Sequence, residues 1–155
     1  MSKIFPLAKI LFHLGNSEWH GFSTESVWAD RIACDRCRLR NTAFFAKGVS
    51  LWDVVAVTPN DNALEFKSII VRGGHSTYRI LVPKAKPISE DEFQRRWEPL
   101  RSLGCSYQSG GFGFKLYAVE VPPNTDMQEV YRLLEKGEKE GVWDFEEGNC
   151  AHSAS

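Results

Sequence analysis

Residues 83–104 read PKAKPISEDEFQRRWEPLRSLG, and within this stretch the pattern of the chain changes from strands to a helix. Two prolines enclose Lys-Ala-Lys, a composition typical of a linker. Ser89 and Glu92 then form a capping box, and apolar residues recur at helical spacing as far as Gly104. Pro99 predicts a kink or an early end of the regular helix. The stretch therefore predicts a boundary followed by an amphipathic helix.

The segments after this helix, together with the strand before it, complete a recognisable order. Thr125 and Gln128 are expected to open a second helix that ends at Gly141. The expected strands are residues 78–82, 105–108, 115–121 and 142–146. Their order, β-α-β-β-α-β, is that of the ferredoxin-like unit, in which two helices cover one face of an antiparallel sheet.

The residues before the linker are expected to form strands alone. The expected strands are residues 10–14, 25–32, 37–41, 53–58 and 64–71. Short strands with frequent turn signals indicate a small barrel or a curled sheet, and the apolar link 42–50 is expected to lie across its end. The predicted fold class is α+β, with a barrel-like β subdomain at 1–82, a ferredoxin-like subdomain at 83–148 that shares strand 78–82, and a flexible tail at 149–155.

Composition narrows the classes of function. The 155 residues carry a net charge of −1, so no global field favours nucleic acid or a membrane surface. No apolar run approaches the roughly 18 residues of a membrane span, and the N-terminus does not read as a signal peptide. Cys34 and Cys37 have the spacing of half a zinc site, but no second pair follows. We expect a cytoplasmic protein with plain thiols, no metal and no cofactor.

The charges are unevenly distributed along the chain. Residues 1–82 carry ten Lys and Arg against seven Asp and Glu, a net charge of +3, whereas residues 83–155 carry nine against thirteen, a net charge of −4. The basic residues that gather are Arg31, Arg36, Arg38, Arg40 and Lys47. The acidic residues that gather are Glu135, Glu138, Glu140, Asp144, Glu146 and Glu147. Each group is either a solvated face or a surface for a partner.

The densest group of reactive side chains lies at residues 72–79, Arg-Gly-Gly-His-Ser-Thr-Tyr-Arg, which is expected to be the turn of a hairpin. In a structural interpretation its His and Ser cap their own backbone. In an enzymatic one, His75 is the acid/base, Ser76 or a water is the nucleophile, Glu25 or Asp53 orients the imidazole, and Arg79 holds an anion. Adjacent residues of a strand point to opposite faces, which argues against a direct Ser–His pair.

Several stretches resemble a bacterial family known only as domain of unknown function 4265. The matching stretches are residues 25–29, 38–48, 53–55, 74–79, 103–105, 118–123 and 133–148. The resemblance extends over nearly the whole chain and implies no established activity or catalytic residue.

Three hypotheses for function remain open. The leading one is a non-enzymatic module that binds a protein, most specifically a bacterial immunity protein that occludes the active cleft of a basic toxin domain, by analogy with other small bacterial proteins. Its contact residues would be the acidic group together with His75 and Arg79. The second is a hydrolase-like or transferase-like enzyme that uses the Gly-Gly-His-Ser turn. The third is a single-stranded nucleic-acid-binding protein that uses the basic segment 31–47 with Trp19, Trp28 and Phe45.

Overall fold

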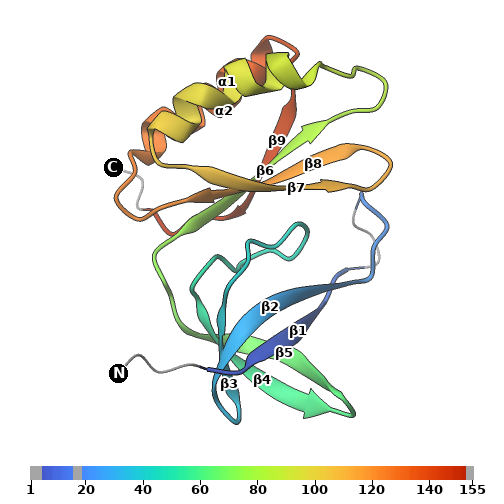
Figure 1. The fold of residues 1–155 in the computed structure, drawn as a ribbon, viewed down its shortest axis with the longest axis vertical. Coiled ribbons are helices and arrows are strands. Elements are labelled where there is room, and N and C mark those ends of the chain that lie inside the picture. The colour runs from blue at the N-terminus through green and yellow to red at the C-terminus, as the bar shows by residue number, and fades with distance from the viewer. Residues whose placement is uncertain (1–4, 16–18, 153–155) are drawn as a thin grey trace.

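The computed structural model describes residues 5–15 and 19–152, and its first half is a β-barrel that lies beneath a sheet with two helices on the sheet's far face (Figure 1). The predicted α+β class, with a curled β subdomain followed by the β-α-β-β-α-β unit, is confirmed. Neither helix in the described part of the chain has the length and apolar character needed to cross a membrane.

The barrel is a closed meander of five strands, β1 (Leu7–His13), β2 (Thr24–Ala33), β3 (Arg36–Leu39), β4 (Val54–Asn60) and β5 (Ala63–Val71). Successive strands pair antiparallel. An odd number of alternating strands brings the first and the last together in the same direction, so the barrel closes with a parallel β1–β5 pair. That closing pair matches only Ile10 with Leu64 and Leu11 with Glu65.

The interior of the barrel follows from the alternation of side chains along its strands. The inward residues are buried apolar ones: Ile10, Phe12, Val27, Ala29, Cys37, Leu39, Val55 and Val57. The connection between β3 and β4 adds Ala43, Ala46 and Val49 to the same core, so the apolar link closes one end of the barrel as expected.

The second sheet has the strand order β7-β8-β6-β9. Its strands are β6 (Ser76–Val82), β7 (Ser106–Gly111), β8 (Lys115–Val121) and β9 (Asp144–Asn149), and all three pairings are antiparallel. The helices are α1 (Glu90–Ser102) and α2 (Met127–Lys139). This is the ferredoxin-like order, with β6 at the centre between β8 and β9.

Helix capping fixes where the two helices begin. Ser89 accepts a hydrogen bond from the Glu92 backbone N–H at 3.1 Å, as the capping box predicts. The cap of α2 is not Thr125 but Asp126, whose carboxylate accepts from the backbone N–H groups of Gln128 and Glu129. Thr125 instead donates to the Leu103 carbonyl at 3.0 Å. Pro99 lies in the last turn of α1, where the helix continues to Ser102.

The Gly-Gly-His-Ser segment does not form the expected hairpin. β5 pairs with β4 and β1, whereas β6 pairs with β8 and β9. Because both edges of β6 are occupied within the second sheet, β6 is not shared with the barrel. The boundary between the subdomains therefore lies at residues 72–75, before the Pro-rich stretch that sequence patterns favoured.

A cluster of aromatic rings joins the barrel to the sheet. Its members are Trp19, His20, Phe22, Phe44, Phe45, Phe112 and Phe114, which come from the β1–β2, β3–β4 and β7–β8 connections. Phe45 is at the centre, with ring centroids 4.3 Å from His20, 4.9 Å from Phe22 and 5.0 Å from Phe112. Such contacts between rings stabilise beyond simple burial, so these three connections hold the two subdomains together.

Gly137 on α2 gives a test of the packing between this helix and the residues after it. A Cβ at this position would lie 2.3 Å from the Trp143 ring, whose indole N–H donates to the Leu134 carbonyl. Gly to Ala in a helix ordinarily stabilises by about 1 kcal/mol. Here we expect Gly137→Ala to lower the free energy of unfolding by about 2 kcal/mol through overpacking. Urea denaturation measures it, with Lys136→Ala as the exposed control, and a gain in stability would contradict this packing.

Candidate functional site

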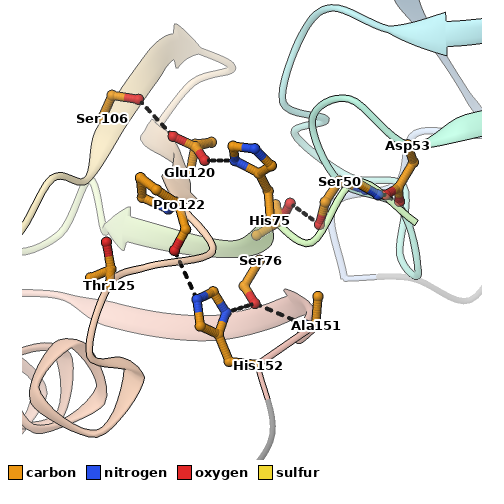
Figure 2. Close-up of polar contacts among 12 residues, drawn as sticks. Ser50, Asp53, His75, Ser76, Ser106, Glu120, Pro122, Thr125, Ala151 and His152 are labelled. Carbon is orange, nitrogen blue, oxygen red and sulfur yellow. Dashed lines mark hydrogen bonds and ion pairs between the residues drawn. The ribbon is translucent and has the colours of Figure 1, made fainter. Parts of the chain in front are cut away.

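The polar residues singled out in the sequence lie near the junction between the barrel and the second sheet, but they belong to separate hydrogen-bond networks. Figure 2 shows Asp53, His75 and Ser76 among them. A buried polar side chain is costly unless it is hydrogen-bonded, so each network contains the partners of a buried polar group.

Asp53 links the barrel end to the connection between the subdomains. Its side chain is 0% exposed and accepts from the backbone N–H groups of Ser50, at 2.9 Å, and Gly73, at 2.8 Å. Arg72 donates to the same carboxylate at 3.3 Å and to the Gly48 carbonyl at 2.7 Å. The carboxylate is therefore saturated by groups that hold the backbone in place.

The two glycines beside this carboxylate are needed for different reasons. Gly73 lies so close to the backbone of Trp52 that a Cβ would meet its carbonyl carbon at 2.9 Å. Gly74 has φ +87°, a conformation that favours glycine. The chemistry predicted for this segment placed its side chains at the turn of a hairpin, whereas its glycines allow the chain to pass close to Trp52 and to change direction.

His75 pairs with Glu120, a residue that sequence analysis did not select. His75 Nδ1 hydrogen-bonds the Glu120 carboxylate, whose other oxygen accepts from Ser106 Oγ at 3.3 Å. Glu120 is 7% exposed and lies in β8 among buried apolar residues. A single carboxylate in an otherwise apolar strand was the signal that could have found it, because such a group needs a partner.

Ser76 pairs with His152, and each side chain has one further hydrogen-bond partner. Ser76 Oγ is 2.6 Å from His152 Nδ1, and it also accepts from the Ala151 backbone N–H at 2.8 Å. His152 Nε2 lies 2.8 Å from the Pro122 carbonyl, an acceptor, so Nε2 carries a proton and donates. The tail was expected to be flexible from residue 149. In the structure β9 extends to Asn149, and Ala151 and His152 make the hydrogen bonds described above. Residues 153–155 lie outside the described part of the chain.

His75 and Ser76 point to different partners, as strand alternation requires (Figure 2). Ser76 is 0% exposed and its hydroxyl lies between His152 and the Ala151 amide. A nucleophile must be reachable by its substrate, and this hydroxyl is not. Its geometry therefore fits attachment of the C-terminal segment to β6.

Glu25 and Arg79 organise the connection between β3 and β4 from opposite sides. The Glu25 carboxylate accepts from the backbone N–H groups of Phe44, Phe45 and Ala46 at 2.6–2.9 Å. Arg79 is 1% exposed and donates to the Ala46 carbonyl at 2.5 Å, with Glu146 at 3.5 Å. The residues proposed for catalysis thus occupy different networks, and each is engaged with the protein's own backbone or side chains.

The acidic group lies on α2, on the turn after it and on the edge strand β9. Glu135 pairs with Lys139, Glu140 with Arg96, and Glu146 with Arg79. Glu147 accepts from the Tyr78 hydroxyl at 3.1 Å and Glu138 from the Phe145 backbone N–H at 3.4 Å. Asp144, Glu138, Glu140 and Glu147 remain exposed to solvent.

A small cleft borders this acidic surface where the barrel meets the sheet. Its volume is 220 Å³, and its lining residues are Trp19, Arg79, Leu81, Leu116, Asp144, Phe145 and Glu146. Its walls are apolar, and its two carboxylates exceed its one guanidinium. An anion in the cleft would meet both carboxylates, whereas a cation would be attracted to them.

The basic group divides between the barrel wall and its edges. Arg38 and Arg40 share the carboxylate of Asp30 at 3.2 and 3.6 Å. Arg31 donates to the Cys34 carbonyl at 2.8 Å, and Arg36 lies 3.9 Å from Asp35. Lys47 is exposed in the β3–β4 connection, apart from these strands.

The cysteines are free thiols in four different environments. Cys34 and Cys150 are exposed, whereas Cys37 and Cys105 are buried. Burial raises the pKa of the Cys37 thiol; it raises the pKa of Cys105 to about 12, with the nearby Glu120 carboxylate acting in the same direction. Among residues 5–15 and 19–152, no three His, Cys, Asp or Glu side chains are grouped in a way that could hold a metal.

These environments predict the reactivity of the thiols, because the thiolate is the reactive form. At pH 8 we expect a disulfide reagent such as DTNB to modify Cys34 and Cys150 in the native protein within minutes. Cys37 and Cys105 should react only after denaturation. Mass spectrometry of the modified peptides identifies the sites, and rapid labelling of Cys105 in the folded protein would disprove its placement.

The hydrogen bonds of Asp53 predict how much this side chain contributes to the stability of the junction. Asp53→Asn preserves the volume of the side chain but turns an amide N–H₂ toward backbone N–H donors and Arg72. We expect the free energy of unfolding to fall by about 2 kcal/mol or more, the range for hydrogen bonds to a charged group. Asp35→Asn, at an exposed position, should change it by less than about 0.5 kcal/mol. Equal stability of the two variants in urea would show that the buried carboxylate does not hold the junction.

Comparison with known proteins bears on the fold and the family. A solved structure described as "Novel crystal structure of a hypothetical protein from Neisseria gonorrhoeae" aligns with 99% of this chain and 100% of that chain, with a TM-score of 0.74 and 16% sequence identity, a likeness of fold alone. No curated protein matches the chain. The family model described as Domain of unknown function (DUF4265) matches residues 25–145, which is more than half of the chain. The resemblance noted in the sequence is confirmed, and the chain belongs to the DUF4265 family.

Proposed function

We propose that the protein is a non-catalytic module that binds a basic protein domain, and that it acts as an immunity protein by covering the active cleft of a toxin. The observation that carries the proposal is the acidic surface of α2 and β9. Residues 135–147 hold six Asp and Glu against Lys136 and Lys139, a net charge of −4. Opposite charge on a partner accelerates encounter and fixes orientation.

The cleft beside this surface adds an anchor to the charge. Its 220 Å³ suits one side chain of a partner rather than a separate substrate. Leu81 and Leu116 offer apolar contact to the stem of a Lys or Arg, Asp144 and Glu146 offer carboxylates to its head, and the Trp19 ring offers a cation–π contact. A buried anchor surrounded by weaker charged contacts is the usual arrangement of a tight protein interface.

The networks at the junction support a non-catalytic role. Glu25 and Asp53 are occupied by backbone N–H groups, and Ser76 and Arg79 are 0% and 1% exposed. An acid/base pair needs to reach the proton that it transfers, whereas these four side chains are hydrogen-bonded within the protein. A role in protein binding requires only that these side chains stabilise the fold.

Charge reversal tests the proposal. Asp144→Lys with Glu147→Lys replaces two negative charges of the acidic surface by two positive ones and so shifts its net charge by +4. We expect association with the basic partner to slow at least about tenfold at low ionic strength, with a smaller change in dissociation, and the difference to shrink as salt screens the charges. Surface plasmon resonance at several salt concentrations measures both rates. Asp35→Lys with Asp91→Lys changes the net charge equally at other exposed sites and should leave the rate within about twofold.

The immunity role is tested in cells. A large secreted effector encoded directly upstream of this gene would provide the toxin domain, and co-expression of the wild-type protein should restore growth. The Asp144→Lys, Glu147→Lys variant should restore it less well. Absence of such an effector, or failure of the wild-type protein to bind and neutralise its domain, would refute this role.

A further inference from the structure

The outer wall of the barrel carries a second charged surface, opposite in sign to the acidic one. It consists of Lys9, Trp28, Arg36, Arg38, Arg40 and Trp52, here called the basic barrel face. The first five residues alternate with inward neighbours such as Ile10, Val27, Ala29, Cys37 and Leu39, which are buried in the core, so strand alternation directs them outward. Trp52 lies in the turn before β4 and is also exposed.

Strand register places the members of this face side by side. Lys9 is paired with Trp28 across β1 and β2, and the Trp28 carbonyl accepts from the Arg40 backbone N–H at 2.9 Å. One row thus runs Lys9, Trp28, Arg40. Asp30 is paired with Arg38 across β2 and β3, two residues along from that row. Trp52 lies beside Arg38, with the guanidinium 5.5 Å from the ring centroid.

The charge of this face is positive after its own ion pairs are counted. Asp30 is the carboxylate within the rows, and it is shared by Arg38 and Arg40. Lys9 has its ammonium 4.9 Å from the Trp28 ring centroid, so its charge is offset by a π face and not by a carboxylate. Arg36 adds a further cation, with Asp35 at 3.9 Å. An incoming anion therefore meets excess positive charge.

The two tryptophans are exposed where a soluble protein would normally bury them. Trp28 is 46% exposed and Trp52 is 37% exposed. Each indole has a cation beside it, Lys9 for Trp28 and Arg38 for Trp52. A ring that accepts a stacked base next to a cation that accepts a phosphate is the arrangement by which small β-barrels hold single strands.

We infer that the basic barrel face binds single-stranded nucleic acid, with bases stacked on Trp28 and Trp52 and phosphates held by Lys9, Arg38 and Arg40. A duplex keeps its bases stacked on one another and offers the indoles no free ring. An acidic protein segment would match the cations but would leave the paired indole-and-cation arrangement without a use. This surface is independent of the proposed protein interface, which lies on α2 and β9.

Fluorescence anisotropy of a labelled twelve-nucleotide oligo(dT) tests the inference on the full-length protein. We expect saturable binding at 50 mM salt, weakened at least about fivefold by Trp28→Ala, since stacking of a single base is lost. Tyr131→Ala is the matched control, because Tyr131 is 46% exposed on α2, away from the barrel, and it should bind as the wild type does. Circular dichroism verifies that each variant is folded.

The salt dependence separates phosphate contacts from stacking. Three neutralised phosphates predict a slope of log K against log salt of about −2 for a single strand. Lys9→Ala with Arg40→Ala should bring the slope to about −0.7, because about two contacts are lost. Lys67→Ala with Lys84→Ala removes the same charge from other exposed sites and should leave the slope unchanged.

Three results would overturn the inference. The first is absence of binding to oligo(dT) below about 100 µM at 50 mM salt. The second is binding that Trp28→Ala leaves intact and that heparin displaces as well as oligo(dT) does, which would mean a general polyanion surface. The third is loss of a protein partner, and not of the oligonucleotide, in the Trp28→Ala variant, which would make the face a protein interface. None of these outcomes depends on the acidic surface.

Discussion

The carboxylate of Asp53 is fully buried and accepts backbone N–H groups from Ser50 and Gly73, so one side chain fixes both the end of the barrel and the start of the connection. Gly73 can reach it only because no Cβ separates its backbone from that of Trp52. A buried carboxylate with too few hydrogen-bond donors would destabilise the fold. Asp53 keeps its donors only while the barrel end and the connection remain in contact. The direction in which β6 enters the second sheet follows from this contact.

The buried polar groups at the junction and the charged groups on the surface have different roles. Buried carboxylates and guanidinium groups hold connections in place. In the β3–β4 connection, Glu25 accepts from backbone N–H groups and Arg79 donates to a backbone carbonyl. The outer surfaces then differ in sign, with carboxylates on α2 and β9 and cations on the barrel wall. Because the two surfaces belong to different subdomains, each can change its side chains without disturbing the core of the other.

Local sequence patterns were sufficient to predict the helices and strands and the β-α-β-β-α-β order of the second subdomain. Caps such as Ser89 and the spacing of apolar residues act within a few positions of the chain. They were not sufficient for the junction. The strong turn signal at Gly73 and Gly74 predicted a hairpin, because nothing local distinguishes a reversal from a crossing between two sheets. His152 was beyond reach for the same reason: its partner Ser76 is 76 positions away, and only the assembled sheet brings them together.

The central position of β6 has a consequence for how the chain is made. All five strands of the barrel lie before residue 72, so they can pair as soon as residue 71 is available. β6 follows at once and is almost entirely buried in the folded protein, but its two neighbours are β8 and β9, and β9 ends at Asn149. During synthesis a strand that the finished fold buries therefore waits with both edges open, and unpaired strand edges favour aggregation.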